Sequence, residues 1–355
     1  MFADTIVLRS SFGLRRIEMP RFAKCLAVVL LGVLCGCEII GPESGGPSRV
    51  MPPPGFGPVP SPAFNPTTEA KVYLGRKLFF DPSLSRDGTI ACATCHDPRK
   101  AFADTRPLST GVSGRVGTRN APSLVNVAYR PLLFWDGRSS SLEDQVVAPL
   151  ESDHEMDEVL SAVLDRLNAD SSYSVLFADV FGEPATATTF TRAIAAYERT
   201  IVGSGAPYDR YIDGRPDALD DAQVRGAALF FGDAGCVGCH GGIRFTDDSF
   251  RNNGLVIAHQ DSGRAHVTHD PQDVGRFRVP TLRNVELTAP YMHDGRLSSL
   301  EEVVNHYNRG GAGTAGQDAS VRPLNLTSGQ RDDFIAFLRS LTDDSIRSGL
   351  GDKAR

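Results

Sequence analysis

The sequence contains no long hydrophobic run, no stretch of alternating polar and apolar residues, and few cysteines. Its most apolar segment, residues 25–34, is too short to span a bilayer, which takes about 20 apolar residues. The missing alternation argues against a sizeable β-sheet. The seven cysteines are not scattered as they are in small disulfide-stabilised proteins. The expected fold class is therefore mainly α with long loops.

The sequence also has fewer basic than acidic residues. The chain has 37 Lys and Arg against 43 Asp and Glu. Residues 1–36 hold five of the former and two of the latter, so the remainder carries a net charge of −9. An acidic surface argues against nucleic acid as a partner and fits a basic electron-transfer protein.

The N-terminal segment has the features of an export signal. Basic residues precede the apolar run, as in a secretory signal peptide. The run leads into a Leu-Cys-Gly-Cys sequence that ends at Cys37 and resembles the lipobox of bacterial lipoproteins. We therefore expect residues 1–37 to be a lipoprotein-type signal, with the mature chain in the periplasm and attached to the membrane only through a lipid on Cys37. Simple cleavage and an uncleaved anchor are the alternatives, and the start is either Met1 or Met19.

Composition and helical periodicity divide the rest of the chain. Residues 38–64 are rich in Pro, Gly and Ser and predict a linker. The folded part is expected to begin at Asn65, which would cap a helix with Pro66 in its first turn. Further amphipathic helices are predicted over 156–167, 187–202, 221–231 and 329–341.

A gapless repeat indicates internal duplication. Residues 122–148 match residues 280–306 at a constant offset of 158, with 12 of 27 positions identical. Each copy follows one of two cysteine pairs, so we expect two related domains. The predicted ranges are 65–217 for the first domain, 218–345 for the second and 346–355 for a tail, with the seam near 215–220.

The two cysteine pairs each belong to a C-x-x-C-H sequence. The two motifs are Cys92-Ala93-Thr94-Cys95-His96 and Cys236-Val237-Gly238-Cys239-His240. Two thiols at this spacing bond the vinyl groups of one haem, and the His that follows coordinates its iron. A zinc ribbon is the alternative, but it would leave each His awkwardly placed directly after a cysteine ligand. The motifs therefore predict two haem c groups, with His96 and His240 as iron ligands.

The repeat also predicts that the two irons differ at their sixth coordination position. The segment Ser299–Glu302 begins a helix whose apolar side includes Tyr307. The residue 158 positions earlier is Pro149, which has no side-chain donor atom. We therefore expect Tyr307 to coordinate the second iron, with Met292 and His306 as alternatives, and the first iron to keep an open position.

An open haem can bind peroxide, whereas a six-coordinate haem mainly transfers electrons. Cleavage of bound peroxide needs a group that takes a proton from one oxygen and returns it to the other. Glu151, His154 and Glu155 follow Pro149 closely and are the local candidates. The sequence does not choose among them.

Several segments resemble the bacterial dihaem cytochrome c peroxidase and MauG family over roughly residues 66–342. Besides the two haem motifs, these segments are 119–124, 135–138, 279–284 and 289–295. The resemblance implies that Trp135 relays electrons between the haems. It also implies that Gln145 and Glu155 line the distal side of the first, peroxidatic haem.

A calcium ion between the domains is a further implication of the resemblance. An Asn and two backbone carbonyls would hold it, and these fall on Asn120, Thr288 and Pro290. Oxygen ligands of this kind suit a hard cation such as calcium.

The chain departs from the classical peroxidases of this family in two places. Residues 97–122 contain no His that would occupy the first iron. Tyr307 stands where classical members have Met and where MauG has Tyr. A phenolate favours ferric iron and lowers its potential relative to Met. Both departures make the chain more similar to MauG.

The expected activity is reduction of hydrogen peroxide to water, with electrons from a small redox protein such as a cytochrome c or a cupredoxin. The alternatives are a MauG-like oxidation of aromatic side chains in a partner protein, and a plain electron carrier. His293 takes the place of Trp135 in the second copy, which makes a role between the haems a hypothesis. The His residues expected at the surface, in a polar loop, are His259, His266 and His269.

Overall fold

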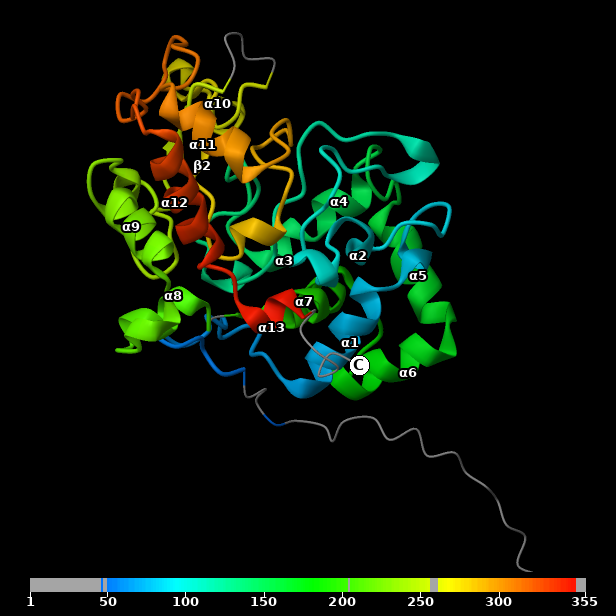
Figure 1. Ribbon diagram of the computed structural model, residues 1–355. Coiled ribbons are helices and arrows are strands. Elements are labelled where there is room, and N and C mark those ends of the chain that lie inside the picture. The colour runs from blue at the N-terminus through cyan, green and yellow to red at the C-terminus, as the bar shows by residue number, and fades with distance from the viewer. Residues whose placement is uncertain (1–45, 47–49, 204, 256–260, 349–355) are drawn as a thin grey trace, which may run out of the picture. The chain divides into compact units, whose positions relative to one another are not determined.

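The computed structural model describes residues 46, 50–203, 205–255 and 261–348 (Figure 1). The predicted export signal, Cys37, His259 and part of the predicted tail lie outside the described residues. No helix in the described ranges is long and apolar enough to cross a membrane.

Helices dominate the described residues, which confirms the mainly α class. The α-helices are α1 (Glu69–Phe79), α2 (Cys92–Cys95), α3 (Leu142–Gln145), α4 (Val147–Glu151), α5 (Leu160–Ala169), α6 (Ser171–Phe181), α7 (Ala187–Glu198), α8 (Pro207–Ile212), α9 (Asp221–Phe231), α10 (Ala265–Thr268), α11 (Leu300–Asn308), α12 (Ser328–Arg339) and α13 (Asp344–Arg347). The sheet found in these residues pairs two short strands, β1 (Phe250–Arg251) and β2 (Phe277–Arg278), in antiparallel register. Long loops connect most helices.

The sequence predicted that Asn65 caps the first helix, but the cap is Thr68. The Thr68 hydroxyl accepts a hydrogen bond from the backbone N–H of Lys71. Asn65 is fully buried, and its amide donates to a Glu143 carboxylate oxygen at 2.6 Å and to the Arg192 carbonyl at 3.0 Å. The prediction was wrong because this side chain serves contacts with residues far along the chain.

Two other predicted helices are shorter than expected. Helix α5 begins at Leu160 and not at 156, because Asp157 has a φ of 50° that a right-handed helix does not accommodate. Helix α7 ends at Glu198 and not at 202, since the next N–H groups bond to carbonyls three residues back in a tightened last turn.

Part of the predicted linker packs against the folded body. The Phe56 ring lies 5.0 Å from the ring of Tyr129 and 5.2 Å from the guanidinium carbon of Arg283. The Tyr129 hydroxyl donates a hydrogen bond to the Gly57 carbonyl. The aromatic ring of Phe56 thus anchors this part of the predicted linker to the folded body.

The two halves of the chain contribute to different hydrophobic cores. Apolar side chains from residues 74–201 form two cores, and Ile346 from the C-terminal end belongs to the second of them. A third core is built from residues 230–341, and Tyr208 already packs against it. Packing thus changes from one half to the other between Ile201 and Tyr208. The domain boundaries themselves stay a prediction.

Each half contains the same close helix crossing. Helices α1 and α7 pack together, as do α9 and α12, which run side by side in Figure 1. At Gly75 an added Cβ would lie 1.9 Å from the Ala193 carbonyl oxygen, and at Gly226 it would lie 2.0 Å from that of Asp333. In each pair the two helices therefore come into close contact at a glycine, because the missing side chain lets their backbones touch.

Replacing either glycine by alanine should lower the free energy of unfolding by about 1–3 kcal/mol, because the added Cβ forces two helices apart. Denaturant unfolding of the haem-loaded protein would measure the change. Gly329→Ala is the matched control, since this exposed glycine of α12 has no atom within 4 Å of an added Cβ. Gly75→Ala and Gly226→Ala variants as stable as the control would contradict the close crossing.

Turns within the two repeated segments also correspond at the offset of 158. The matched features are left-handed backbone at Asn126 and Asn284, bridges between Leu133 and Ser139 and between Tyr291 and Leu297, and helix caps at Ser141 and Ser299. Duplication predicts such correspondence, although the duplication itself stays a prediction.

Candidate functional site

Each C-x-x-C-H motif lines its own cavity. The first cavity has a volume of about 1110 Å³ and the second about 260 Å³. The motif residues that line them are Cys92, Cys95 and His96 in the first, and Cys236, Cys239 and His240 in the second. Both motifs coil into short helical turns, which direct two thiols and one imidazole to the same space.

The two motif histidines are held in the same way. His96 Nδ1 lies 3.0 Å from the Phe102 carbonyl oxygen, and His240 Nδ1 lies 3.1 Å from that of Phe245. A carbonyl at this nitrogen places the proton on Nδ1 and leaves the Nε2 lone pair for a metal. Burial lowers the pKa of both imidazoles, which favours the neutral form that binds iron. Both residues therefore fit axial haem ligands.

Zinc does not fit either motif. In the part of the chain that the structure describes, no three His, Cys, Asp or Glu side chains are placed to hold one metal ion. A zinc ribbon requires four such ligands. A haem c requires only two thiols and one imidazole from the motif, which is the set that each cavity contains.

The first cavity brings together the residues predicted on its distal side. Gln145, Pro149 and Glu155 all line it. Of the three local acid–base candidates, Glu155 lies at the cavity, whereas Glu151 and His154 are exposed and do not line it. The geometry therefore favours Glu155 as the proton carrier.

Close packing on Gly111 holds the loop that carries Glu155. The Glu155 carbonyl accepts a hydrogen bond from the Val112 N–H at 2.8 Å, and a Cβ added to Gly111 would lie 2.3 Å from the same oxygen. Burial raises the pKa of the Glu155 carboxyl, although the charges of Arg138 and His154 oppose this. This carboxyl therefore holds a proton at higher pH than an exposed glutamate does.

The second cavity contains two of the three predicted sixth ligands. Tyr307 and Met292 both line it, and the Asn253 amide donates to Tyr307 Oη and to Met292 Sδ, each at 3.3 Å. His306 does not line it, because its Nε2 faces the Asn253 carbonyl at 3.0 Å. Tyr307 and Met292 thus remain candidates. Asn253, which no sequence motif marks, positions both.

Trp135 lies at the boundary of the two cavities and lines both. Its Nε1–H donates to the Asn120 carbonyl at 2.8 Å, and the Asn120 N–H donates to the His293 carbonyl at 2.7 Å. His293 also lines both cavities, with its ring stacked on Phe277 at 3.6 Å between centroids. Each repeat therefore supplies one ring between the cavities.

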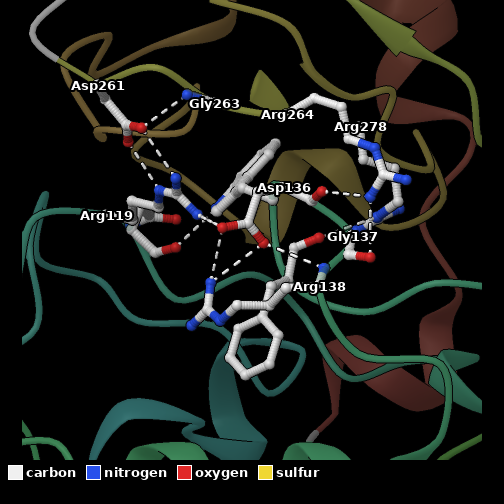
Figure 2. A network of polar contacts seen from close by, with 11 residues as sticks. Arg119, Asp136, Gly137, Arg138, Asp261, Gly263, Arg264 and Arg278 are labelled. Carbon is white, nitrogen blue, oxygen red and sulfur yellow. Dashed lines mark hydrogen bonds and ion pairs between the residues drawn. The ribbon is translucent and has the colours of Figure 1, made fainter. Parts of the chain in front are cut away.

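An ion-pair network around the buried Asp136 holds the turn that follows Trp135 (Figure 2). Asp136 is 1 % exposed and lies between Arg119, at 2.7 Å, and Arg138, at 2.9 Å. Arg119 also pairs with Asp261 at 2.7 Å. Because Asp261 belongs to the second half of the chain, the network ties the two halves together beside Trp135.

The three residues predicted to hold calcium lie together at the second cavity. Asn120, Thr288 and Pro290 all line it. The Asn120 amide nitrogen donates to the carbonyls of Arg106 and Pro107, which orients its side-chain oxygen. That oxygen and the carbonyls of Thr288 and Pro290 accept no hydrogen bond from the described residues. The arrangement suits a hard cation, and the calcium site stays a prediction.

Glu198 also lines the first cavity, although no sequence motif marks it. It is 5 % exposed, and its Oε2 finds no hydrogen-bond partner among the described residues. Burial raises the pKa of its carboxyl to about 8, with the charge of Arg199 opposing the rise. Glu198 falls four residues after Ile194 on the apolar side of α7. A charged residue at such a position was a visible signal in the sequence.

The remaining predicted surface histidines behave as expected where the structure describes them. His266 and His269 are both exposed.

Comparisons with known proteins agree with this geometry. A family model for di-haem cytochrome c peroxidase matches residues 69–217. The chain is 41 % identical to the methylamine utilization protein MauG of Methylorubrum extorquens over 287 residues, which cover 80 % of this chain and 81 % of that protein. It is 35 % identical to the cytochrome c551 peroxidase of Pseudomonas aeruginosa over 79 % of this chain and 81 % of that protein.

A solved structure shares the fold. It is a MauG-like protein associated with microbial copper homeostasis, and it is 35 % identical to the chain with a TM-score of 0.79. The match covers 83 % of this chain and 95 % of that structure.

Proposed function

Because the chain belongs to the family of dihaem cytochrome c peroxidases and MauG, we propose that it reduces hydrogen peroxide to water at the haem held by His96. Each peroxide takes up two electrons and two protons and yields two water molecules. The haem iron supplies the position at which peroxide binds and accepts electrons. A small redox protein such as a cytochrome c or a cupredoxin supplies those electrons, and a haem held by His240 would accept them first.

The difference between the two cavities carries this proposal. Pro149 lines the first cavity and has no side-chain atom that can bind iron, whereas Tyr307 and Met292 line the second. A haem in the second cavity would have a side chain available as its sixth ligand and would suit electron transfer, whereas Pro149 would leave a haem in the first cavity open to peroxide.

The residues around the first haem take separate roles. Glu155 accepts a proton from the near peroxide oxygen and returns it to the far one, while Gln145 orients the peroxide by hydrogen bonding. Trp135, which borders both cavities, relays electrons between the two haems. A calcium ion on Asn120, Thr288 and Pro290 would stiffen the boundary beside this tryptophan.

The spectrum of the oxidised resting protein tests the asymmetry. One of the two haems should give a high-spin ferric signal, because its sixth position is open, and one equivalent of peroxide should change that signal. Tyr307→Phe should alter the other, low-spin haem and leave the high-spin signal in place. Two low-spin haems that do not respond to peroxide would support a plain electron carrier.

Oxidation of a partner protein is a second candidate function. Its support is the phenol of Tyr307 in the second cavity, together with the absence of any His from residues 97–122. Under this hypothesis, peroxide added with the partner would oxidise or cross-link aromatic side chains, which mass spectrometry detects. Rapid peroxide turnover with a cytochrome donor and no modified partner would favour the peroxidase.

A further inference from the structure

Arg130 is a partly buried cation that lines both haem cavities. The residues that line both are Asn120, Pro122, Arg130, Trp135 and His293. Among these, Arg130 alone carries a permanent charge. Its guanidinium donates to the Ser123 carbonyl at 2.7 Å, and no carboxylate among the described residues forms an ion pair with it.

The surroundings of Arg130 are short of negative charge. Arg244 and Arg278 lie near it, and among the described residues the one carboxylate close to the three guanidinium groups is that of Asp248. Asp248 is already paired with Arg244 and lies 3.6 Å from Arg278. The side chains of Asp248 and Arg278 are 5 % and 1 % exposed, so water does little to screen them. Three cations and one anion leave an excess of two positive charges.

A missing counter-ion also explains the electrostatics of Arg130 itself. Burial and the charge of Arg278 lower the pKa of Arg130 to about 9. A guanidinium nevertheless stays charged at neutral pH, so the protein holds a partly desolvated cation at a net cost. Anionic groups entering from the two cavities would remove that cost.

We propose that Arg130 binds one propionate carboxylate of each haem and so forms a shared anion-binding site between the two cavities. Haem c carries two propionates, and the planar fork of an arginine presents several N–H donors to carboxylates. The proposal rests on haem occupying both cavities, as the proposed function also requires. It does not depend on which reaction the first haem performs.

A shared cation links the redox properties of the two haems. A positive charge near an iron in a poorly solvated site favours the reduced, less positive state. Since Arg130 borders both cavities, it should raise the reduction potential of both haems. If each haem instead had its own cation, removal of one cation would change the potential of one haem only.

Potentiometric titration of the haem-loaded Arg130→Gln protein tests the proposal, with absorbance reporting each haem. We expect the midpoint potentials of both haems to fall together. Arg225→Gln is the control, because this exposed arginine pairs with Asp333 and lines neither cavity, and it should leave both potentials unchanged. A shift at one haem only, or at neither, would overturn the shared site.

If Arg130→Gln does not fold, Arg130→Lys provides a second test. Lysine retains the charge but loses the planar fork. The propionate bending bands in resonance Raman spectra should then shift for both haems, and unchanged bands would again overturn the proposal. A wild-type protein that does not turn over peroxide would count against the proposed function alone, since neither the potentials nor the Raman bands involve peroxide.

Discussion

Glu155→Gln should slow the reaction of the haem-loaded protein with peroxide by about 10²- to 10⁴-fold, the usual contribution of a positioned acid–base group. Gln has nearly the same shape but neither accepts nor returns the proton. Stopped-flow absorbance of the resting protein mixed with excess peroxide measures the rate. The resting spectrum should not change, because Glu155 lines the cavity without binding the iron in the proposed arrangement.

Glu151→Gln provides the matched control for this substitution. Glu151 is the last residue of α4, four positions before Glu155, but it is exposed and does not line the cavity, so the rate of the Glu151→Gln protein should equal that of the wild type. Equal rates for Glu155→Gln and Glu151→Gln would remove Glu155 from the proton path.

The pH dependence of the same reaction carries a further signature of Glu155. Burial raises the pKa of this carboxyl, and the ionised form is the one that accepts the peroxide proton. The rate should therefore fall as the pH drops, and the fall should begin at higher pH than the pKa of an exposed glutamate. The Glu155→Gln protein should lack this step in its profile.

Glu198→Gln should remove a large pH dependence from the stability of the folded protein. In the folded state burial raises the pKa of Glu198 to about 8, against an ordinary value of 4.5. Between these values the folded protein holds a proton that the unfolded chain releases, so stability falls as the pH rises. The slope is about 1.4 kcal/mol for each pH unit across this window.

Denaturant unfolding at pH values from about 5 to about 8 would measure this effect on the haem-loaded protein, where a slope of about 1.4 kcal/mol per pH unit is expected. The variant should lose the slope that Glu198 contributes and gain stability over the wild type towards the alkaline end. Glu183→Gln, which changes an exposed glutamate, should keep the wild-type slope. A Glu198→Gln protein with the wild-type slope would mean that Glu198 is already ionised in the folded state.

The sequence was sufficient to identify the haem-attachment chemistry, because that chemistry is local. Two thiols and an imidazole within five residues specify a haem c site wherever the rest of the chain runs. Periodicity likewise predicted the helices that became α7, α9 and α12, since an apolar stripe at helical spacing must be buried. Alignment of the two repeat copies was enough to show that Pro149 corresponds to Tyr307.

Contacts between distant residues decided what the sequence left open. Asn65 serves as a tertiary donor and not as a helix cap, because its partners Glu143 and Arg192 lie far along the chain. The Asn253 amide likewise donates to Met292 and Tyr307, which lie 39 and 54 residues further along the chain.

The sequence by itself thus determined that this chain holds two haems in a mainly helical fold. The tertiary structure alone decided which charged groups lie beside those haems: Glu198 is buried at the first cavity, and Arg130 lines both. The physical reason is that ligation chemistry is written in adjacent residues, whereas burial and charge balance arise only when separate segments pack around a shared cavity.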